Sequence, residues 1–280
     1  MKIGIVTDST CDLPGSIIEQ YDLEVVPCIL VMGGREYVDG IDITREEFYR
    51  QLSSLPASVS VTTAAPSIGE FMTRYDSLFS RGCDHILSIH AAGALTSIID
   101  SARQAAQDFV GRITVIDSTS LTLGLGFQVL AAIEAAELGL QAALDAIEST
   151  RKRLDIYAAL STMENLKRSG RVPGVVAALG SLLSIKPLIR LKDSEVKAIS
   201  AVRTISQGNE KILDLLLQQG ELERLAILHT GAEARAREFL DILMQKASQS
   251  VPRDILMVNV TTVIGTHVGP NGLGFAVIRK

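Results

Sequence analysis

Short, continuous aliphatic runs alternate with segments of helical spacing throughout the first half of this chain. The runs occupy residues 2–7, 24–31, 85–90 and 113–117. Helical spacing of apolar residues is found at 16–21, 45–52, 68–80, 96–109 and 121–153. Short aliphatic runs are typical of parallel strands that are buried on both faces. This alternation of strands and helices predicts a doubly wound α/β domain with a mostly parallel sheet.

The second half of the chain contains the same kinds of segment in a different order. We expect strands at 157–160, 186–191, 196–202, 224–229, 255–263 and 274–279, and helices at 163–169, 174–183, 209–218 and 232–247. The turn K-D-S-E between two of these strands is typical of a hairpin, in which the strands are antiparallel. The pattern predicts a second α/β domain with a mixed sheet. We place the boundary between residues 1–153 and 154–280, where the long helical stretch ends.

Composition excludes several classes of protein. The chain has 280 residues, a net charge of -5 and a pI near 5.5, whereas nucleic-acid binding usually needs a basic domain or stripe. No apolar run approaches the roughly 20 residues that span a bilayer. The first ten residues become polar too soon for a signal peptide. The odd number of cysteines (Cys11, Cys28 and Cys83) favours a reducing compartment, so we expect a cytoplasmic protein.

The apolar part of the composition is mainly aliphatic. Aromatic residues make up only 4% of the chain and Trp is absent, yet mean hydropathy is +0.27. An ordinary aliphatic core produces such a composition, and an apolar cavity would produce it too.

A glycine-rich loop near the C-terminus, G-T-H-V-G-P-N-G-L-G-F at residues 265–275, raises the question of a nucleotide site. Dinucleotide loops read G-x-G-x-x-G between a strand and a helix, and phosphate-binding loops carry a lysine. This loop has neither pattern and is followed by a strand. We therefore interpret it as a tight connection that presents His267 and backbone N–H groups. A glycine-rich hairpin with an exposed or capping histidine is the alternative.

Hydroxyl groups gather in V-T-T-A-A-P-S, residues 61–67. Thr62 and Thr63 end a strand-like segment, and Ser67 stands where a helix begins. Open α/β sheets bind ligands at the carboxyl ends of their strands, and a helix N-terminus favours anions. The segment thus suggests an anion site, although both threonines also suit an ordinary strand end.

A second loop of small residues follows another strand, in S-I-H-A-A-G-A-L-T-S at residues 88–97. Ala92 and Gly93 leave space for a ligand to approach the backbone. If this strand neighbours the one before Thr62, two helix N-termini converge on one carboxylate or phosphate held by neutral donors. A turn shaped only by packing remains the alternative.

Catalytic and metal motifs are not found. The sequence has no G-x-S-x-G elbow and no H-E-x-x-H pair, so a serine hydrolase of that type and a zinc site are not indicated. His90 and His267 could act as bases, but no carboxylate is obviously placed to orient either one. The acidic residues near loops are interpreted as capping or solvated groups: Asp8, Asp12, Asp39 and Asp42.

Six segments in the same order resemble the DegV family of bacterial proteins, which includes the fatty acid-binding subunits called FakB. V-T-D-S-T-C-D-L-P resembles the opening strand and loop of that family, and T-T-A-A-P-S resembles its T-T-S-Q-P-S motif. V-I-D-S-T-S-L-T-L-G-L-G and N-L-K-R-S-G-R-V resemble its I-D-S-x-x-x-x-x-G-x-G and L-x-x-G-G-R-I segments. I-K-P-L-I with A-V-R-T, and H-V-G-P-N-G-L-G, resemble its I-K-P with K-V-R-T and its H-x-G-P-G-x-x-G. The likeness covers essentially the whole chain.

The resemblance implies two α/β domains with a ligand cleft between them that buries a long-chain fatty acid such as palmitate or oleate. The carboxylate-binding residues it implies are Thr62, Thr63, the loop at Ala92 and Gly93, and His267. Such a protein uses no cofactor and performs no chemistry. It presents the acid to a separate fatty acid kinase that makes acyl phosphate, and Arg171 and Arg203 are expected to face that partner.

The chain departs from the family pattern in the small-residue loop, where the usual I-S-S-x-L-S-G-T is replaced by A-A-G-A-L-T-S-I. The serine expected to contact the carboxylate becomes Ala92 or Gly93. A hydroxyl bond to an ionised carboxylate contributes about 1.5–3 kcal/mol, so its loss would weaken binding about tenfold or more. Backbone N–H groups of Gly93 or Ala94, or those of the helix start at Thr96 and Ser97, are expected to substitute.

Two other functions fit the residues as well. One is an α/β enzyme, a hydrolase or transferase, that uses His267 with a loop hydroxyl. The other is a regulator or interaction protein for which the lipid is only structural.

Overall fold

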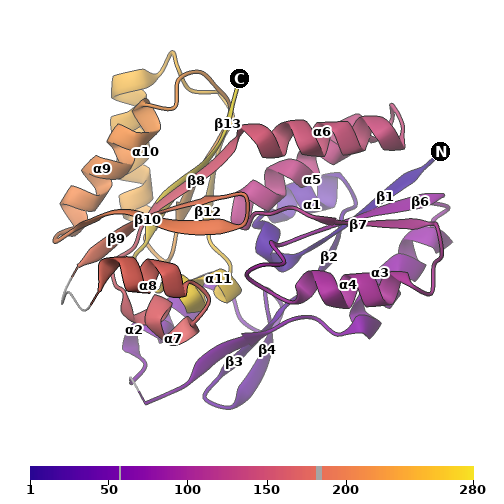
Figure 1. Ribbon diagram of the computed structural model, residues 1–280, viewed down its shortest axis with the longest axis horizontal. Coiled ribbons are helices and arrows are strands. Elements are labelled where there is room, and N and C mark those ends of the chain that lie inside the picture. The colour runs from indigo at the N-terminus through magenta and orange to yellow at the C-terminus, as the bar shows by residue number, and fades with distance from the viewer. Residues whose placement is uncertain (57, 181–184) are drawn as a thin grey trace.

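The computed structural model describes residues 1–56, 58–180 and 185–280. In the first half, the parallel sheet has the strand order β2-β1-β6-β7. Helices α3 and α4 cover one of its faces and α5 the other (Figure 1). The elements are β1 (Ile3–Asp8), β2 (Glu24–Val26), β6 (His85–His90), β7 (Ile113–Asp117), α1 (Gly15–Gln20), α3 (Ile68–Ser80), α4 (Ile98–Ala106) and α5 (Thr122–Ala136). The prediction of a doubly wound parallel sheet is confirmed.

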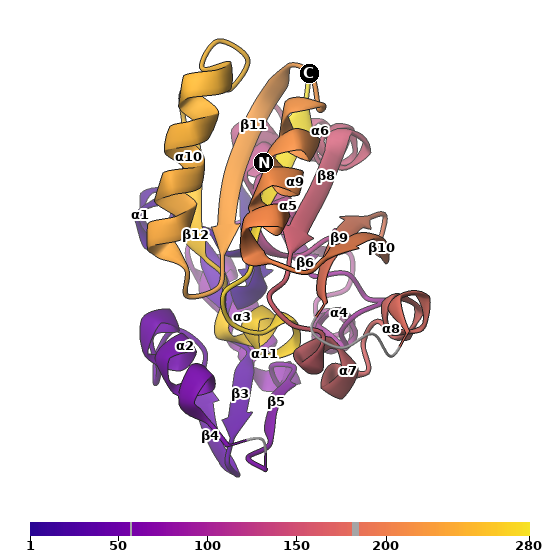
Figure 2. The same cartoon turned by 90° about the vertical axis from the view of Figure 1, so that its left-hand side faces the viewer.

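The second sheet has six strands in the order β10-β9-β8-β13-β11-β12. Among the described strands of this sheet, only β11 and β12 are parallel neighbours, so the predicted mixed sheet is confirmed. Helices α9 (Ile205–Leu217) and α10 (Glu233–Ala247) cover its outer face (Figure 2). The strands are β8 (Leu154–Ala159), β9 (Lys186–Lys192), β10 (Glu195–Val202), β11 (Leu222–His229), β12 (Ile255–Asn259) and β13 (Leu273–Arg279). The domain boundary at residues 153 and 154 stays a prediction, and we propose it because α6 (Leu140–Arg153) ends there.

A third, small antiparallel sheet was not predicted. It has the order β4-β3-β5, formed by β3 (Ile29–Met32), β4 (Arg35–Val38) and β5 (Val61–Ala64), and α2 (Arg45–Ser54) packs against it. The single strand expected at 24–31 is wrong because Pro27, which has no N–H to donate to a ladder, separates β2 from β3. Gly33 and Gly34, with φ of 60° and 82°, form the tight turn from β3 to β4.

Helix α5 lies between the two large sheets and is buried on nearly every side. The helical stretch expected at 121–153 is two helices, because Gly139 adopts a φ of 110° between α5 and α6. The two glycines of L-G-L-G in α5 allow close packing. A Cβ at Gly124 would lie 2.6 Å from Cδ1 of Ile156, and one at Gly126 would lie 2.6 Å from the carbonyl oxygen of Cys11.

The glycine-rich region near the C-terminus differs from the prediction. Strand β12 ends at Asn259, and α11 (Thr262–Val268) occupies residues that were expected to form a strand end and a loop. His267 therefore stands in the last turn of a helix and not in a hairpin. Two more short helices are α7 (Glu164–Ser169) and α8 (Pro173–Leu179). The end of the helix predicted at 174–183 lies outside the described residues.

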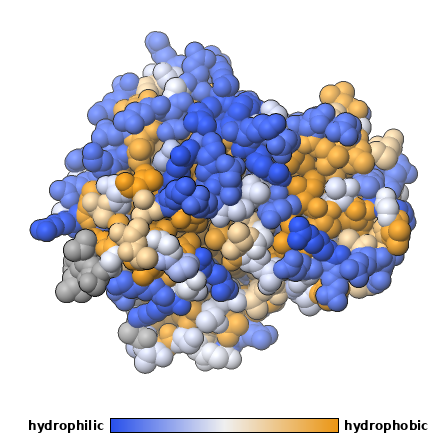
Figure 3. Space-filling view, viewed as in Figure 1, coloured by the Kyte–Doolittle hydropathy of each residue, from blue (hydrophilic) through white to orange (hydrophobic). Residues whose placement is uncertain are grey.

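The apolar part of the composition is divided between interior and surface. Figure 3 shows apolar side chains gathering over edge strand β7, between α4 and α6. All five residues of β7 are half-buried, and Val110, in the loop before it, is 88% exposed. Part of the aliphatic excess is therefore exposed along this edge strand, although Ile113, Val115 and Ile116 also pack against the core.

Candidate functional site

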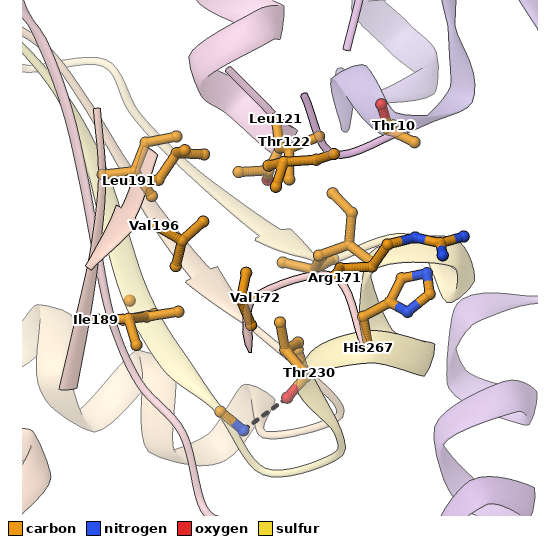
Figure 4. A pocket seen from close by; sticks show the side chains of 18 of the residues that line it. Thr10, Leu121, Thr122, Arg171, Val172, Ile189, Leu191, Val196, Thr230 and His267 are labelled. Carbon is orange, nitrogen blue, oxygen red and sulfur yellow. Dashed lines mark hydrogen bonds between the residues drawn. The ribbon is translucent and has the colours of Figure 1, made fainter. Parts of the chain in front are cut away.

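An apolar cavity lies between the parallel sheet and the six-stranded sheet. Strands β8, β9, β10, β11 and β13, helix α11 and the N-terminal ends of α4 and α5 contribute to its walls (Figure 4). The empty space amounts to about 1140 Å³ when the solvent at its mouth is counted. The aliphatic lining includes Leu121, Ile156, Leu160, Ile189, Leu191, Val196, Leu228, Val263 and Ile264.

Three threonines in the wall use their hydroxyl groups for bonds within the protein. The hydroxyl of Thr10 donates to Oδ1 of Asp8 at 2.5 Å, and that of Thr122 donates to Oδ2 of Asp12 at 2.6 Å. The hydroxyl oxygen of Thr230 accepts a bond of 2.6 Å from the N–H of Gly272. Since these hydroxyls already have partners, most of the cavity wall offers only van der Waals contact to a ligand.

The polar end of the cavity is formed by Thr63, His267 and Arg171, which all belong to its lining. Oγ1 of Thr63 lies 3.1 Å from Nε2 of His267. Nδ1 of His267 is buried and has no hydrogen-bond partner among the described residues. Burial and, to a smaller extent, the positive charge of the nearby Arg171 together lower the pKa of His267 from 6.5 to about 4. The imidazole is therefore neutral near pH 7, and the positive charge at this end comes from Arg171.

Of the residues predicted from the hydroxyl-rich motif, only Thr63 reaches the cavity. Side chains alternate along β5, so Thr63 is half-buried whereas Thr62 is exposed and is not part of the lining. The motif was also expected at the carboxyl edge of the main sheet. It lies instead in the small antiparallel sheet, where Thr63 pairs with Leu30 of β3.

The small-residue loop lies beside the cavity, but Ala92 and Gly93 do not line it. The N–H of Ala92 donates to the carbonyl of Ser120 at 2.9 Å. The N–H of Gly93 donates to Oδ2 of Asp117 at 3.1 Å. These two N–H groups are therefore engaged within the protein. The loop contributes Leu95 and Thr96 to the lining.

The two arginines assigned to a partner surface have different surroundings. Arg171 is exposed and also lines the cavity beside His267. Arg203 is exposed between β10 and α9, where its N–H donates to Oε1 of Gln207. Sequence reasoning missed Arg171 as a cavity residue because nothing in N-L-K-R-S-G-R-V distinguishes the side chain that turns inward.

A buried chain of polar groups behind the cavity was also missed. Nδ1 of His90 lies 3.0 Å from Oδ2 of Asp8, and Nε2 lies 2.6 Å from Oγ of Ser88. The view that no carboxylate orients His90 is thus wrong. Ser88, His90 and Asp8 are all 0% exposed, and the hydroxyl of Tyr75 lies 2.8 Å from Oγ of Ser88. No substrate can reach Ser88 in this fold. We therefore assign these hydrogen-bonded polar groups a structural role.

The loop carboxylates are more buried than their sequence context indicated. Asp8 and Asp12 are 0% exposed and Asp39 is 5% exposed, so the view that they are solvated is wrong. Asp8 does cap the turn after β1, because it accepts a bond from the N–H of Thr10. Asp42 also fits the capping interpretation, since it accepts a bond from the N–H of Val38.

Two features are absent from the described part of the chain. None of its helices is both long and apolar enough to span a bilayer. Its His, Cys, Asp and Glu side chains form no group of three or more that could hold a metal ion.

Comparison with known proteins adds an independent line of evidence. The model of the DegV family, a family described as uncharacterised proteins, matches residues 2–280. A DegV domain-containing protein of Staphylococcus aureus strain MRSA252 is 30% identical over 282 residues, which cover 99% of this chain and 98% of the relative.

Solved structures give the same result. A DegV family protein of Thermus thermophilus, whose structure is described under fatty acid binding, is 34% identical, with a TM-score of 0.88 and complete coverage of both chains. DegV of Bacillus subtilis, described as a fatty acid binding protein, is 28% identical, with a TM-score of 0.86 and complete coverage of both chains.

Proposed function

Because the chain belongs to the DegV family, we propose that it is a non-catalytic carrier of a long-chain fatty acid such as palmitate or oleate. The acyl chain of the fatty acid would occupy the cavity between the two large sheets. The description of the Thermus thermophilus and Bacillus subtilis proteins as fatty acid binding supports this proposal.

The observation that carries the proposal is an apolar cavity with one polar end. Every buried methylene of an acyl chain contributes about 0.8 kcal/mol, and the hydroxyls of Thr10 and Thr122 in the wall already donate to Asp8 and Asp12. Thr63, His267 and Arg171 provide hydrogen-bond donors and one positive charge where the carboxylate would lie. A charge-assisted bond from Arg171 would be the strongest of these interactions.

Within the predicted carboxylate site we propose unequal roles. Thr63 and His267 would contact the carboxylate directly. Ala92 and Gly93 would shape the loop that brings Leu95 and Thr96 to the cavity, since their own N–H groups are engaged. Arg171 would take over the contribution that a loop serine makes elsewhere in the family.

We also propose that the loaded protein presents the carboxylate to a separate fatty acid kinase in the cytoplasm. The exposed position of Arg171 at the polar end supports this, because the carboxylate would lie near the surface. Arg203, exposed at the start of α9, would belong to the docking surface for the kinase.

An enzyme that uses His267 is less well supported. His267 forms no hydrogen bond or ion pair with any acidic side chain of the described residues, and its Nδ1 has no partner there. A general base usually has a group that orients its second nitrogen.

The decisive experiment is mass spectrometry of the purified protein, first in its native state and then after denaturing extraction. A stoichiometric long-chain fatty acid is expected, and its length and saturation would define the ligand. A protein that is empty, and stays empty after incubation with palmitate and oleate, would refute the proposal.

A further inference from the structure

Helix α11 is too short to hold His267 in place by itself. It has seven residues, and isolated helices of that length are unstable in water. Its N-cap residue, Thr261, makes no side-chain capping bond to the helix. The position of His267 must therefore come from contacts with other parts of the chain. Figure 2 shows α11 beside α2 and the small sheet β4-β3-β5.

Two buried carboxylates hold the first turn of α11. The N–H of Thr261 donates to Oδ1 of Asp12 at 2.8 Å. The hydroxyls of Thr261 and Thr262 donate to the two oxygens of Asp39, at 2.5 and 2.7 Å. Both threonines are 0% exposed. Three hydrogen bonds therefore attach the start of α11 to Asp12 and Asp39, two residues that are far from it in the sequence.

Helix α2 completes this arrangement from the other side. Nη1 of Arg45 lies 3.0 Å from Oδ1 of Asp12 and donates to the carbonyl of Asn259 at 2.5 Å. The hydroxyl of Tyr49 donates to the carbonyl of Val260 at 2.8 Å. A Cβ at Gly265 would lie 2.8 Å from Cε1 of Tyr49, so α11 packs directly on this ring.

The small sheet and its helix thus control both members of the pair at the polar end of the cavity. Strand β5 carries Thr63, while Asp39, Arg45 and Tyr49 come from the segment between β4 and the end of α2 and hold the helix that carries His267. A change in the bonds at Thr261 and Thr262 would displace His267 relative to Thr63 without touching the cavity wall.

We propose that Asp12, Asp39, Arg45 and Tyr49 are positioning residues for carboxylate binding, acting through residues 259–262 at the start of α11 and so on His267. This inference rests on the proposed fatty acid site for its effect on affinity. It assigns a role to Asp12 and Asp39, whose sequence context suggests only capping or solvated groups. The arrangement of His267 itself can be tested without any ligand.

The test compares two double variants of the full chain that differ only in the hydroxyls. Thr261→Val with Thr262→Val removes the bonds to Asp39 and keeps the volume, while Thr261→Ser with Thr262→Ser keeps the bonds. Oleate affinity is measured by titration calorimetry on delipidated protein. The pKa of His267 is measured by NMR on histidine-labelled protein, with His267→Gln to assign its signal. Asp42→Asn is the matched control, because Asp42 accepts a bond from Val38 and none from α11.

We expect the valine pair to bind oleate at least tenfold more weakly and the pKa of its His267 to rise towards 6.5. The serine pair and Asp42→Asn should stay within threefold of wild type, with an unchanged pKa. A valine pair that melts at a lower temperature but keeps both affinity and pKa would overturn the proposal, because the bonds would then only stabilise the fold.

A second variant covers the case in which the valine pair does not fold. Tyr49→Phe removes the hydroxyl that bonds the carbonyls of Val260 and Thr261 at the start of α11 and keeps the ring, and it should weaken oleate binding about threefold and raise the pKa of His267. No change in either quantity would overturn the proposal. If wild type binds no oleate but the pKa still rises in the valine pair or in Tyr49→Phe, the positioning role holds and the proposed function fails.

Discussion

Oγ1 of Thr63 lies 3.1 Å from Nε2 of His267, although the two residues are 204 positions apart in the chain. This contact joins a strand of the small sheet to a helix near the C-terminus, at the polar end of an otherwise apolar cavity. The neutral state of His267 follows from its burial and from Arg171 beside it. A carboxylate at this place would therefore meet hydrogen-bond donors and a single positive charge.

Thr63→Val tests this contact by removing one hydroxyl and keeping the shape of the side chain. A bond to an ionised carboxylate contributes about 1.5–3 kcal/mol, so we expect the dissociation constant for palmitate to rise about tenfold or more. Titration calorimetry on delipidated protein measures the change. Thr62→Val is the matched comparison on the neighbouring, exposed position of β5 and should change the constant less than twofold. Equal effects of the two variants would contradict the assignment to Thr63.

The pKa of His267 predicts a pH dependence of stability. Its value falls from 6.5 to about 4 on folding, so between these pH values the unfolded chain binds more protons than the native one. The contribution of neutral His267 is thus complete above pH 6.5 and is lost as pH falls towards 4, by about 3 kcal/mol at most.

Urea unfolding of wild type and His267→Gln at several pH values measures this loss. The difference between the two proteins cancels contributions from other groups, including Asp12, whose pKa is raised to about 6 by burial against the opposing effect of Arg45. Wild type should lose stability relative to the variant as pH falls from 6.5 to 4. A difference that is independent of pH would show that His267 is not held in its neutral form.

The parallel sheet and most of the mixed sheet were predictable because their strands are aliphatic runs bounded by helical periodicity. Helix α11 was not, since V-I-G-T-H-V combines β-branched residues with a glycine, and both are poor helix formers. The start of this helix is held by bonds that Thr261 and Thr262 donate to Asp12 and Asp39, which come from distant parts of the chain.

The candidate site also has one part that could be predicted from the sequence and one part that could not. The motif T-T-A-A-P-S and the glycine-rich loop drew attention to Thr63 and His267, which both line the cavity. Which of two adjacent threonines turns inward depends on the register of β5 against β3, which pairs Thr63 with Leu30. The inward orientation of Arg171 depends on the path of the chain between α7 and α8. Neither can be derived from local pattern.

Gly124→Ala tests the close packing of α5 against the six-stranded sheet. The added Cβ would lie 2.6 Å from Cδ1 of Ile156 and would also clash with Oγ of Ser120. Overpacking of this kind costs about 1–3 kcal/mol, which should exceed the gain of alanine in helix propensity. Gly69→Ala in α3 is the control, because its Cβ would meet no atom closer than 3.8 Å. Urea unfolding should show a loss for the first variant only, and equal stabilities would contradict the packing role.

The end of the cavity opposite His267 is formed by Ile189, Leu191 and Val196 of the β9–β10 hairpin (Figure 4). If the carboxylate lies at His267, the terminal methyl group of the ligand lies against these side chains.

Val196→Phe fills this end of the cavity and leaves the polar end unchanged. The fatty acids extracted from the purified variant should therefore shift towards shorter chains, at the same total amount per protein. Lys197→Ala, an exposed position on the same strand, should leave the chain lengths as in wild type. Mass spectrometry of the extracted acids measures both. An unchanged length distribution in Val196→Phe would mean that the acyl chain ends elsewhere in the cavity.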